Sequence, residues 1–552
     1  MNTANLTREE TSRRAADIAV RSYRVEVDLR GAPNSERASF PTRTTVEFSS
    51  LSDTTWLDFI GESVESVTVN GTQIPVHYDG ARIRLSGLAG ENTVTVDAHA
   101  RYSRSGEGLH RFTDPVDDAT YLYTQYEPAD ARRVFACFEQ PDLKGRFTFV
   151  VWAPQSWEVL SNQQIALRSG ECVTFEQTLP ISTYITAIVA GPYHRVDAVW
   201  RGPREDGPSE GGDGEDGDGE GGGGEDEGEL EVPLGVLCRA SLASSLDADD
   251  IVRVTRQCMD FYSRAFEYPY PFGKYDQVFV PEYNLGAMEN PGCVTFTEAY
   301  VFRGTATADQ RQRRANTIAH EMAHMWFGDL VTMVWWDDLW LKESFADYMG
   351  SLVCAEATEF SDAWVAFANR RKAWAYVQDQ LPTTHPVVAT IDDLEAAKLN
   401  FDGITYAKGA SVLKQLVAYV GRDAFFRGAQ QYFRDHAFGN TTLDDLLTAL
   451  SESSGRDLRE WSRAWLETTG MSTVSWDGDA IVQTDPRPHR IAIGRYEEAP
   501  DGTIERVSRI DVDIDGERTA VDVAPAALVL PNDDDLTYAK VRLDEHSLAT
   551  VE

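Results

Sequence analysis

His320-Glu321-Met322-Ala323-His324 is followed nineteen residues later by Glu343, within Trp340-Leu341-Lys342-Glu343. Two histidines four residues apart lie on the same face of a helix, so both imidazoles can reach one metal ion. A carboxylate from a second helix completes three protein ligands and leaves a fourth position for water, as a catalytic zinc site requires. The pattern predicts metal-assisted hydrolysis, with one Zn²⁺ per chain held by His320, His324 and Glu343.

Both histidines are expected on a helix over residues 308–327, a stretch without proline or glycine. Thr307 and Gln310 have the spacing of a capping box at its start, and a second helix is expected over residues 341–357. The segment that connects the two helices is long enough to reverse the direction of the chain. The first turn of the second helix, which carries Glu343, can therefore face the histidines.

Glu321 has a different expected role from the two histidines beside it. At about 3.6 residues per turn it points roughly 100° around the helix from His320, so it should not bind the metal. It is instead placed to hold the metal-activated water and to take its proton as general base. Asp347, four residues after Glu343, has two interpretations. It either orients a ligand imidazole or is an exposed or capping aspartate.

Three other stretches accompany the histidine pair along the chain. They are Thr-Gln-Tyr-Glu-Pro at residues 124–128 (with Asp-Ala-Arg-Arg at 130–133), Gly-Ala-Met-Glu-Asn at 286–290, and Tyr-Ala-Lys-Gly-Ala at 406–410. Together, and in this order, the four stretches resemble the aminopeptidase N family of gluzincin zinc metallopeptidases. Residues 286–290 match that family's exopeptidase motif letter for letter, and the resemblance runs from about Tyr23 to the end of the chain.

The resemblance implies a role for each matched residue. Glu289 and Glu127, with Gln125 beside them, correspond to the residues that bind the free α-ammonium of a peptide, since a buried cation needs carboxylates or carbonyls as partners. Tyr406 corresponds to the catalytic tyrosine, whose phenol donates to the oxyanion of the tetrahedral intermediate. The substrate-binding residues implied in this way are Gln125, Glu127, Gly286, Ala287, Met288, Glu289 and Asn290.

Two departures from the family pattern stand out. Lys342 and Ser344 occupy positions where many members carry asparagine and glycine, and neither is expected to bind the metal. Members usually continue into a large helical C-terminal domain, whereas this sequence stops at Glu552. The chain is interpreted as a native short form, a truncated chain or one part of a split gene.

Alternation and helical patterns predict a multidomain α+β protein. Short alternating runs such as residues 23–29 and 93–96 favour strands near the N-terminus, and similar runs return near residues 509–514. The expected parts are an N-terminal segment (1–20), a β-rich domain (21–200), an acidic Gly-rich disordered insertion (201–232), a thermolysin-like mixed α/β zinc catalytic domain (233–470, by resemblance) and a small β-sandwich-like domain (471–552).

Composition excludes several classes of partner. The net charge is -38, which disfavours nucleic acid and anionic membrane surfaces, and no apolar run is long enough to span a membrane. Residues 205–231 hold thirteen acidic side chains and no basic one, a composition typical of disorder. Six scattered cysteines are expected to be reduced, mostly buried thiols, and residues 1–20 lack an apolar signal core, so a cytoplasmic location is predicted.

The predicted function is a zinc aminopeptidase that removes N-terminal residues from peptides with a free N-terminus. Three alternatives remain open. A thermolysin-like endopeptidase would not need Glu289 and Glu127. A leukotriene-hydrolase-like bifunctional enzyme usually has glycine where Ala287 stands, and an inactive scaffold member would not need its ligands intact. The sequence carries no signal for an oligomeric state.

Overall fold

The computed structural model describes residues 3–203 and 229–551. It contains two compact units. The first comprises Met1–Trp335, Asp392–Glu395 and Phe433–Asn440, and the second comprises the remaining segments, Trp336–Ile391, Ala396–Tyr432 and Thr441–Glu552. The predicted acidic insertion falls mostly on residues 204–228, which lie outside the described residues.

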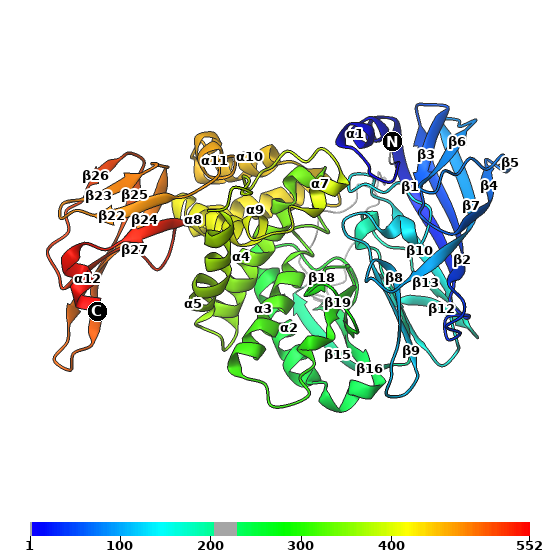
Figure 1. The fold of residues 1–552 in the computed structure, drawn as a ribbon, viewed down its shortest axis with the longest axis horizontal. Coiled ribbons are helices and arrows are strands. Elements are labelled where there is room, and N and C mark those ends of the chain that lie inside the picture. The colour runs from blue at the N-terminus through cyan, green and yellow to red at the C-terminus, as the bar shows by residue number, and fades with distance from the viewer. Residues whose placement is uncertain (1–2, 204–228, 552) are drawn as a thin grey trace, which may run out of the picture. The chain divides into compact units, whose positions relative to one another are not determined.

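A twelve-stranded sheet dominates the N-terminal part of the first unit (Figure 1). Its long strands alternate buried and exposed side chains, as expected for a sheet with one face in the core. In order, its main path is β11 (Glu158–Ser161), β14 (Ile188–Gly191), β9 (Thr120–Gln125), β8 (Gly108–Thr113), β7 (Glu91–Ser103), β2 (Ser39–Ser50), β1 (Ile18–Asp28), β10 (Arg146–Trp152), β13 (Cys172–Phe175) and β12 (Ile165–Ser169). The other two strands of this sheet are β4 (Ser63–Val69), which pairs with β7, and β5 (Thr72–Ile74), which pairs with β4. A separate two-stranded sheet contains β3 (Thr54–Asp58) and β6 (Arg82–Ser86).

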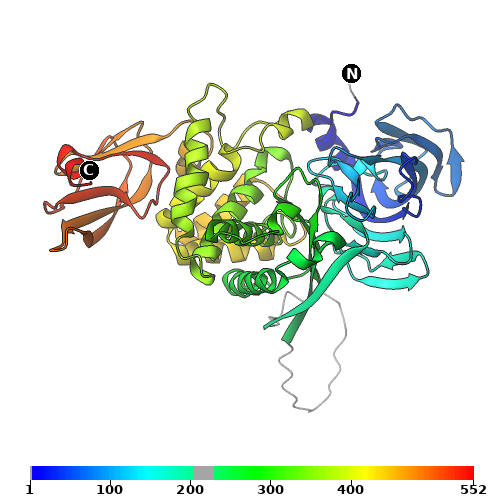
Figure 2. The ribbon, with the colours of Figure 1, turned by 60° about the horizontal axis from the view of Figure 1, so that its bottom comes forward.

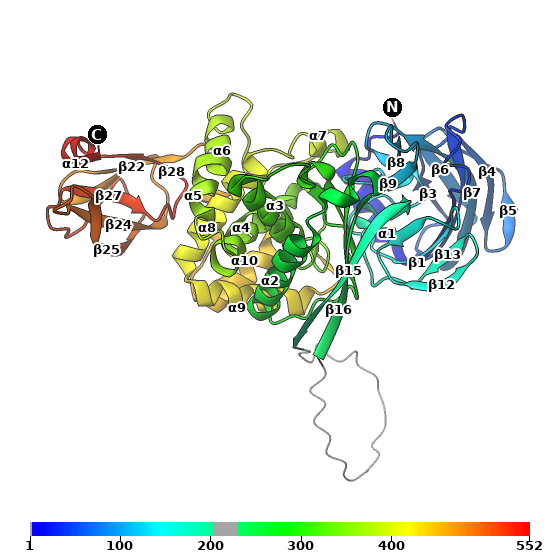
Figure 3. The same ribbon diagram turned by 90° about the horizontal axis from the view of Figure 1, so that it is seen from below.

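A five-stranded sheet follows in the first unit, in the order β15 (Tyr193–Pro203), β16 (Glu229–Arg239), β17 (Tyr275–Val280), β19 (Cys293–Thr297) and β18 (Ala287–Met288). β15 and β16 form the long antiparallel pair that is prominent in Figure 3. Every residue of β17 is buried, as befits a strand with parallel neighbours on both sides. The short edge strand β18 carries the predicted Gly-Ala-Met-Glu-Asn motif.

Two helices of the first unit, α2 (Ala248–Phe266) and α3 (Ala308–Ala323), pack against each other. The hydroxyl of Tyr262 on α2 donates to the Ala319 carbonyl on α3 at 2.7 Å. The ring of Trp326, just beyond α3, lies 5.6 Å from that of Tyr262 and 5.3 Å from that of Phe266. These contacts fix the end of α3 where both histidines lie.

The second unit begins with helices. They are α4 (Trp340–Ala357), α5 (Ala363–Ala366), α6 (Ala373–Gln378), α8 (Gly409–Val420), α10 (Leu443–Ser454) and α11 (Arg459–Trp465), with π-helical segments η6 (Phe367–Lys372) and η7 (Ile404–Lys408). Two further helices, α7 (Leu394–Lys398) and α9 (Arg422–His436), have residues in both units. Helix α4 is buried on all sides from Trp340 to Cys354 and packs against η7 and α8. The expected helix over residues 341–357 is confirmed.

Two small sheets end the second unit (Figure 2). One contains β26 (Arg518–Ala520), β23 (Ala480–Thr484), β22 (Ser472–Trp476) and β28 (Ala539–Arg542), and the other β25 (Ile504–Ile514), β24 (His489–Glu498) and β27 (Leu528–Asp533), with α12 (Glu545–Val551) after them. Val474, Ile481 and Ile491 belong to their shared apolar core. The predicted α+β class is confirmed, with strands at both ends of the chain and helices between them.

The described residues include no helix that combines the length and the apolarity needed to cross a membrane. The six cysteines are thiols, and five of them are buried. The prediction of mostly buried thiols is therefore confirmed.

A buried ion pair anchors the N-terminal helix α1 (Arg8–Asp17), for which the sequence analysis assigned no structure. Nη1 of Arg14 donates to the Asp58 carboxylate at 2.7 Å, and neither side chain is exposed to solvent. The guanidinium also lies 4.6 Å from the centre of the Trp56 ring. Removing one partner would leave the other charge buried and unbalanced.

We expect Asp58→Asn to lower the free energy of unfolding by about 3–5 kcal/mol, because Arg14 would remain buried without its counter-charge. Urea unfolding followed by circular dichroism measures the change. Glu9→Gln is the control, since it removes an exposed ion pair with Arg13 on the same helix and should cost less than about 1 kcal/mol. Equal effects of the two substitutions would contradict this account of Arg14.

Candidate active site

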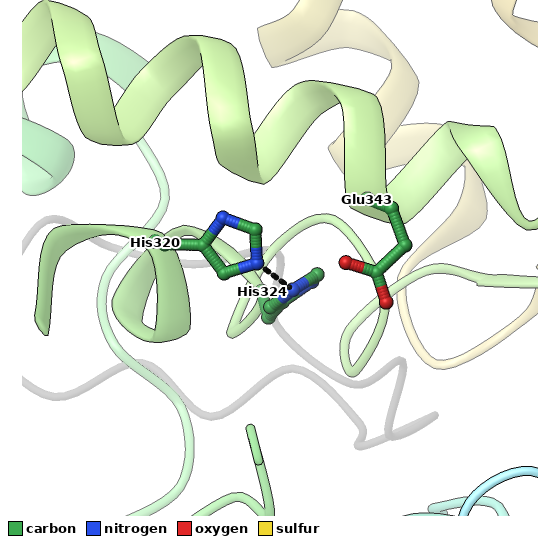
Figure 4. A group of neighbouring side chains, drawn as sticks. All are labelled: His320, His324 and Glu343. Carbon is green, nitrogen blue, oxygen red and sulfur yellow. Dashed lines mark hydrogen bonds between the residues drawn. The ribbon is translucent and has the colours of Figure 1, made fainter. Parts of the chain in front are cut away.

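The two predicted histidine ligands lie at the end of α3. The capping box is present at the start of this helix, where the Gln310 amide donates to Thr307 Oγ1 at 3.2 Å and the Thr307 amide donates to Gln310 Oε1 at 2.9 Å. His320 lies in the last turn, and His324 caps the helix with helical backbone angles. The i, i+4 relation therefore holds, and the two Nε2 atoms lie 3.1 Å apart (Figure 4).

The expected helix over residues 308–327 is too long by four residues. α3 ends at Ala323, and the amides of Met325 and Trp326 bond three residues back, to Met322 and Ala323. Beyond this tighter turn the Phe327 carbonyl accepts from Nδ1 of His324 at 3.0 Å. That bond places the proton on Nδ1 and leaves the Nε2 lone pair for a metal.

Glu343 reaches the histidines from the first turn of α4. Its carboxylate points toward His324 in Figure 4, and the ligand atoms of His320, His324 and Glu343 all lie within 4.8 Å of one another. Two nitrogens bound at about 2.0–2.1 Å to a tetrahedral ion are roughly 3.3 Å apart. The observed 3.1 Å between the Nε2 atoms fits that geometry, so two imidazoles and one carboxylate form a suitable donor set for zinc.

The predicted base lies beside this cluster. Glu321 is buried, and its carboxylate lies within 4.8 Å of ligand atoms of both His324 and Glu289. The neighbouring residue His320 therefore joins the metal cluster, while Glu321 faces the Gly-Ala-Met-Glu-Asn segment. The expectation that Glu321 acts as a base and does not bind the metal stays a prediction, since its carboxylate also lies close to the His324 ligand atom.

The predicted ammonium-binding residues also come together. Oxygens of Glu127, Glu289 and Glu343 lie within 4.8 Å of one another. Three carboxylates at this distance repel one another unless a cation or protons lie among them. Gln125, at the end of β9, contacts residues next to this group: its Oε1 accepts from the Tyr283 hydroxyl at 2.5 Å. Its Nε2 lies 3.6 Å from the sulfur of Met288.

The rest of the motif follows the edge strand β18. Ala287 and Met288 pair with Phe296 and Thr295 of β19. Asn290 is buried, and its amide nitrogen donates to Thr295 at 3.4 Å. A Cβ added at Gly286 would meet no heavy atom within 4 Å, so no packing inside the molecule requires glycine there.

Tyr406 lies in the π-helical segment η7 and is half-buried. The guanidinium carbon of Arg371 lies 5.8 Å from the centre of its ring. Arg371 in turn pairs with Asp347, which is buried on α4. The interpretation of Asp347 as an exposed aspartate is therefore wrong. Asp347 lies in the buried part of α4, and the Arg371 guanidinium balances its charge.

Comparisons with known proteins agree with this arrangement. A profile of the peptidase family M1 domain matches residues 251–465, and a profile of the peptidase M1 N-terminal domain matches residues 62–185. Aminopeptidase N of Streptomyces lividans is 49% identical, over 99% of this chain and 64% of its own length. The chain belongs to peptidase family M1.

More distant relatives match a smaller share. Probable aminopeptidase 2 of Sulfurisphaera tokodaii and tricorn protease-interacting factor F2 of Thermoplasma acidophilum are each 30% identical, over 76% of this chain and 50% of their own length. The chain thus spans about half to two thirds of the length of these relatives. The predicted ligands, base and tyrosine lie in the matched M1 domain, and Gln125 and Glu127 lie in the matched N-terminal domain.

The two departures from the family M1 pattern have contacts that sequence reasoning missed. Nζ of Lys342 donates to Oε1 of Glu343 at 2.8 Å, which holds the predicted ligand carboxylate in one orientation. The hydroxyl of Ser344 donates to the Thr405 carbonyl, next to Tyr406, at 2.6 Å. A lysine directly beside the predicted ligand Glu343, in a segment expected to be helical and packed, was the available signal, since lysine is rarely buried without a partner.

Proposed function

We propose that this family M1 chain is a zinc aminopeptidase that removes residues one at a time from peptides with a free N-terminus. The observation that carries the proposal is that two further carboxylates, Glu127 and Glu289, lie close to Glu343 of the donor set. A metallopeptidase that cuts within a chain needs only the donor set and a base. A cluster of extra acidic groups supports recognition of an ammonium beside the scissile bond.

The cluster divides into two functions in this proposal. Glu343 is a metal ligand, while Glu127 and Glu289 bind the ammonium of the first residue, with Gln125 alongside. The open space at Gly286 supports a substrate backbone lying against the segment formed by Gly286, Ala287, Met288 and Asn290. Binding the ammonium at a fixed distance from the metal ligands limits cleavage to the first peptide bond.

Zinc in such a donor set supplies a Lewis acid that activates water and polarises the scissile carbonyl. Glu321 takes the proton of the attacking water and delivers it to the leaving amine. The hydroxyl of Tyr406 donates to the oxyanion that forms as the carbonyl carbon becomes tetrahedral. Five buried thiols support a reducing compartment such as the cytoplasm for this chemistry.

A comparison of one unblocked pentapeptide with its N-acetyl form tests the proposal. The unblocked peptide should lose residues in order from its N-terminus, as followed by mass spectrometry. The acetylated peptide should react at least about 100-fold more slowly, because it leaves buried carboxylates without their cation. Internal fragments produced from both peptides at similar rates would support an endopeptidase and contradict the proposal.

A further inference from the structure

Helix α4 connects the metal cluster to the segment that carries Tyr406, and it does so within one helical turn. Glu343 joins the donor set. Ser344, the next residue, donates its hydroxyl to the Thr405 carbonyl at 2.6 Å. Asp347, one turn further on, accepts from both Nε and Nη2 of Arg371, at 3.1 and 2.9 Å.

Arg371 and Tyr406 both lie in π-helical segments, η6 and η7, which contact each other. A π-helical turn is rare and often marks a functional site, because it moves one side chain away from the direction that a regular helix would give it. Here the guanidinium of Arg371 lies 5.8 Å from the centre of the Tyr406 ring. It also lies 5.1 Å from the Trp374 ring.

A cation over the face of an aromatic ring is attracted by the electrons of the ring. The same positive charge draws electron density away from the phenol O–H bond. The hydroxyl thereby becomes a better hydrogen-bond donor. Asp347 keeps Arg371 in place, because a buried carboxylate retains its counter-charge. The arginine therefore has a fixed position, set by the helix that carries Glu343.

We propose that Arg371, held by Asp347, is a positioning residue for Tyr406. It fixes the direction of the phenol relative to the metal ligands and strengthens the donation of its hydroxyl to the oxyanion. The inference rests on the proposed function, in which Tyr406 makes that donation. Asp347 thereby acts on Tyr406 through Arg371. This partner differs from the ligand imidazole that the sequence suggested for Asp347.

Steady-state kinetics on an aminoacyl p-nitroanilide, with full-length chain and zinc present, test the inference. Arg371→Gln should lower kcat about tenfold and leave KM within about twofold, because the affected contact forms only in the transition state. Arg371→Lys keeps the charge without the planar fork and should recover part of the loss. Asp347→Asn alone should lower kcat by part of the amount seen for Arg371→Gln. In the Arg371→Gln background, Asp347→Asn should lower kcat little further.

A double-mutant cycle with Tyr406→Phe separates positioning from general support of the fold. Tyr406→Phe alone should lower kcat about 100-fold, and adding Arg371→Gln should change the rate by less than about twofold. Arg370→Gln is the matched control, since it removes an exposed arginine from the same segment and should behave as wild type.

Two outcomes would overturn the inference in different ways. If Arg371→Gln lowers kcat equally with and without the tyrosine hydroxyl, or not at all, Arg371 does not act through Tyr406, and the proposed function stands. If Tyr406→Phe keeps wild-type turnover, the proposed role of Tyr406 fails and this inference fails with it.

Discussion

Replacing Glu321 with glutamine is expected to lower turnover of an aminoacyl p-nitroanilide by about 10³-fold to 10⁴-fold, with zinc content unchanged. Glutamine keeps the shape of the side chain but cannot take a proton, and general acid–base catalysis contributes up to about 10⁴-fold. The donor set of His320, His324 and Glu343 remains intact in this variant. Kinetics together with metal analysis of the purified protein measure both quantities.

Controls separate the loss of the base from the loss of the metal. Asp309→Asn alters the opposite end of the same helix, where Asp309 pairs with Arg313, and should retain full activity. A chelator should inactivate the wild type, and added zinc should restore it. Residual activity within about tenfold of wild type in Glu321→Gln would refute the proposed base.

Replacing Glu289 with glutamine is the second large expected effect, with kcat/KM for unblocked substrates reduced about 10³-fold. Breaking a buried charge pair typically costs about 2–5 kcal/mol, and each 1.4 kcal/mol is a factor of ten. Glu289 stands close to both Glu321 and Glu127, so its loss affects both the binding and the alignment of the substrate. The selectivity for unblocked over N-acetyl peptides should fall with the rate.

Glu282→Gln is the matched control for Glu289. Glu282 lies seven residues upstream, its side chain is 59% exposed, and it contacts His110 rather than the carboxylate cluster. It should change kcat/KM by less than about twofold. A Glu289→Gln variant that loses rate equally on unblocked and acetylated peptides would show that the carboxylate does not recognise the ammonium.

The local features of the site could be predicted from sequence because they depend on nearby residues. The capping box at Thr307 and the i, i+4 placement of His320 and His324 follow from helical geometry alone. The alternating run at residues 23–29 lies largely in β1, as expected from its pattern. The four motifs, in this order, were also enough to indicate a resemblance to the aminopeptidase N family.

Features that depend on distant residues were missed. The contact of Arg371 with Asp347 joins residues 24 positions apart, and no spacing rule predicts such a pair. At the early end of α3 the His324 ring donates to a carbonyl three residues on, an arrangement that propensity cannot reveal. Likewise, the hydroxyl of Ser344 acquires its role only when η7 packs against α4.

The pairing of β15 with β16 has a practical consequence. Pro203 and Glu229 are direct partners in the strand register, so the chain leaves the sheet and returns to it at neighbouring points. The alignment of the two strands is fixed by their own eleven residue pairs, whatever joins their ends. We therefore expect the end of this strand pair to tolerate insertion of a reporter domain whose own termini are adjacent, with the pairing of β15 and β16 retained.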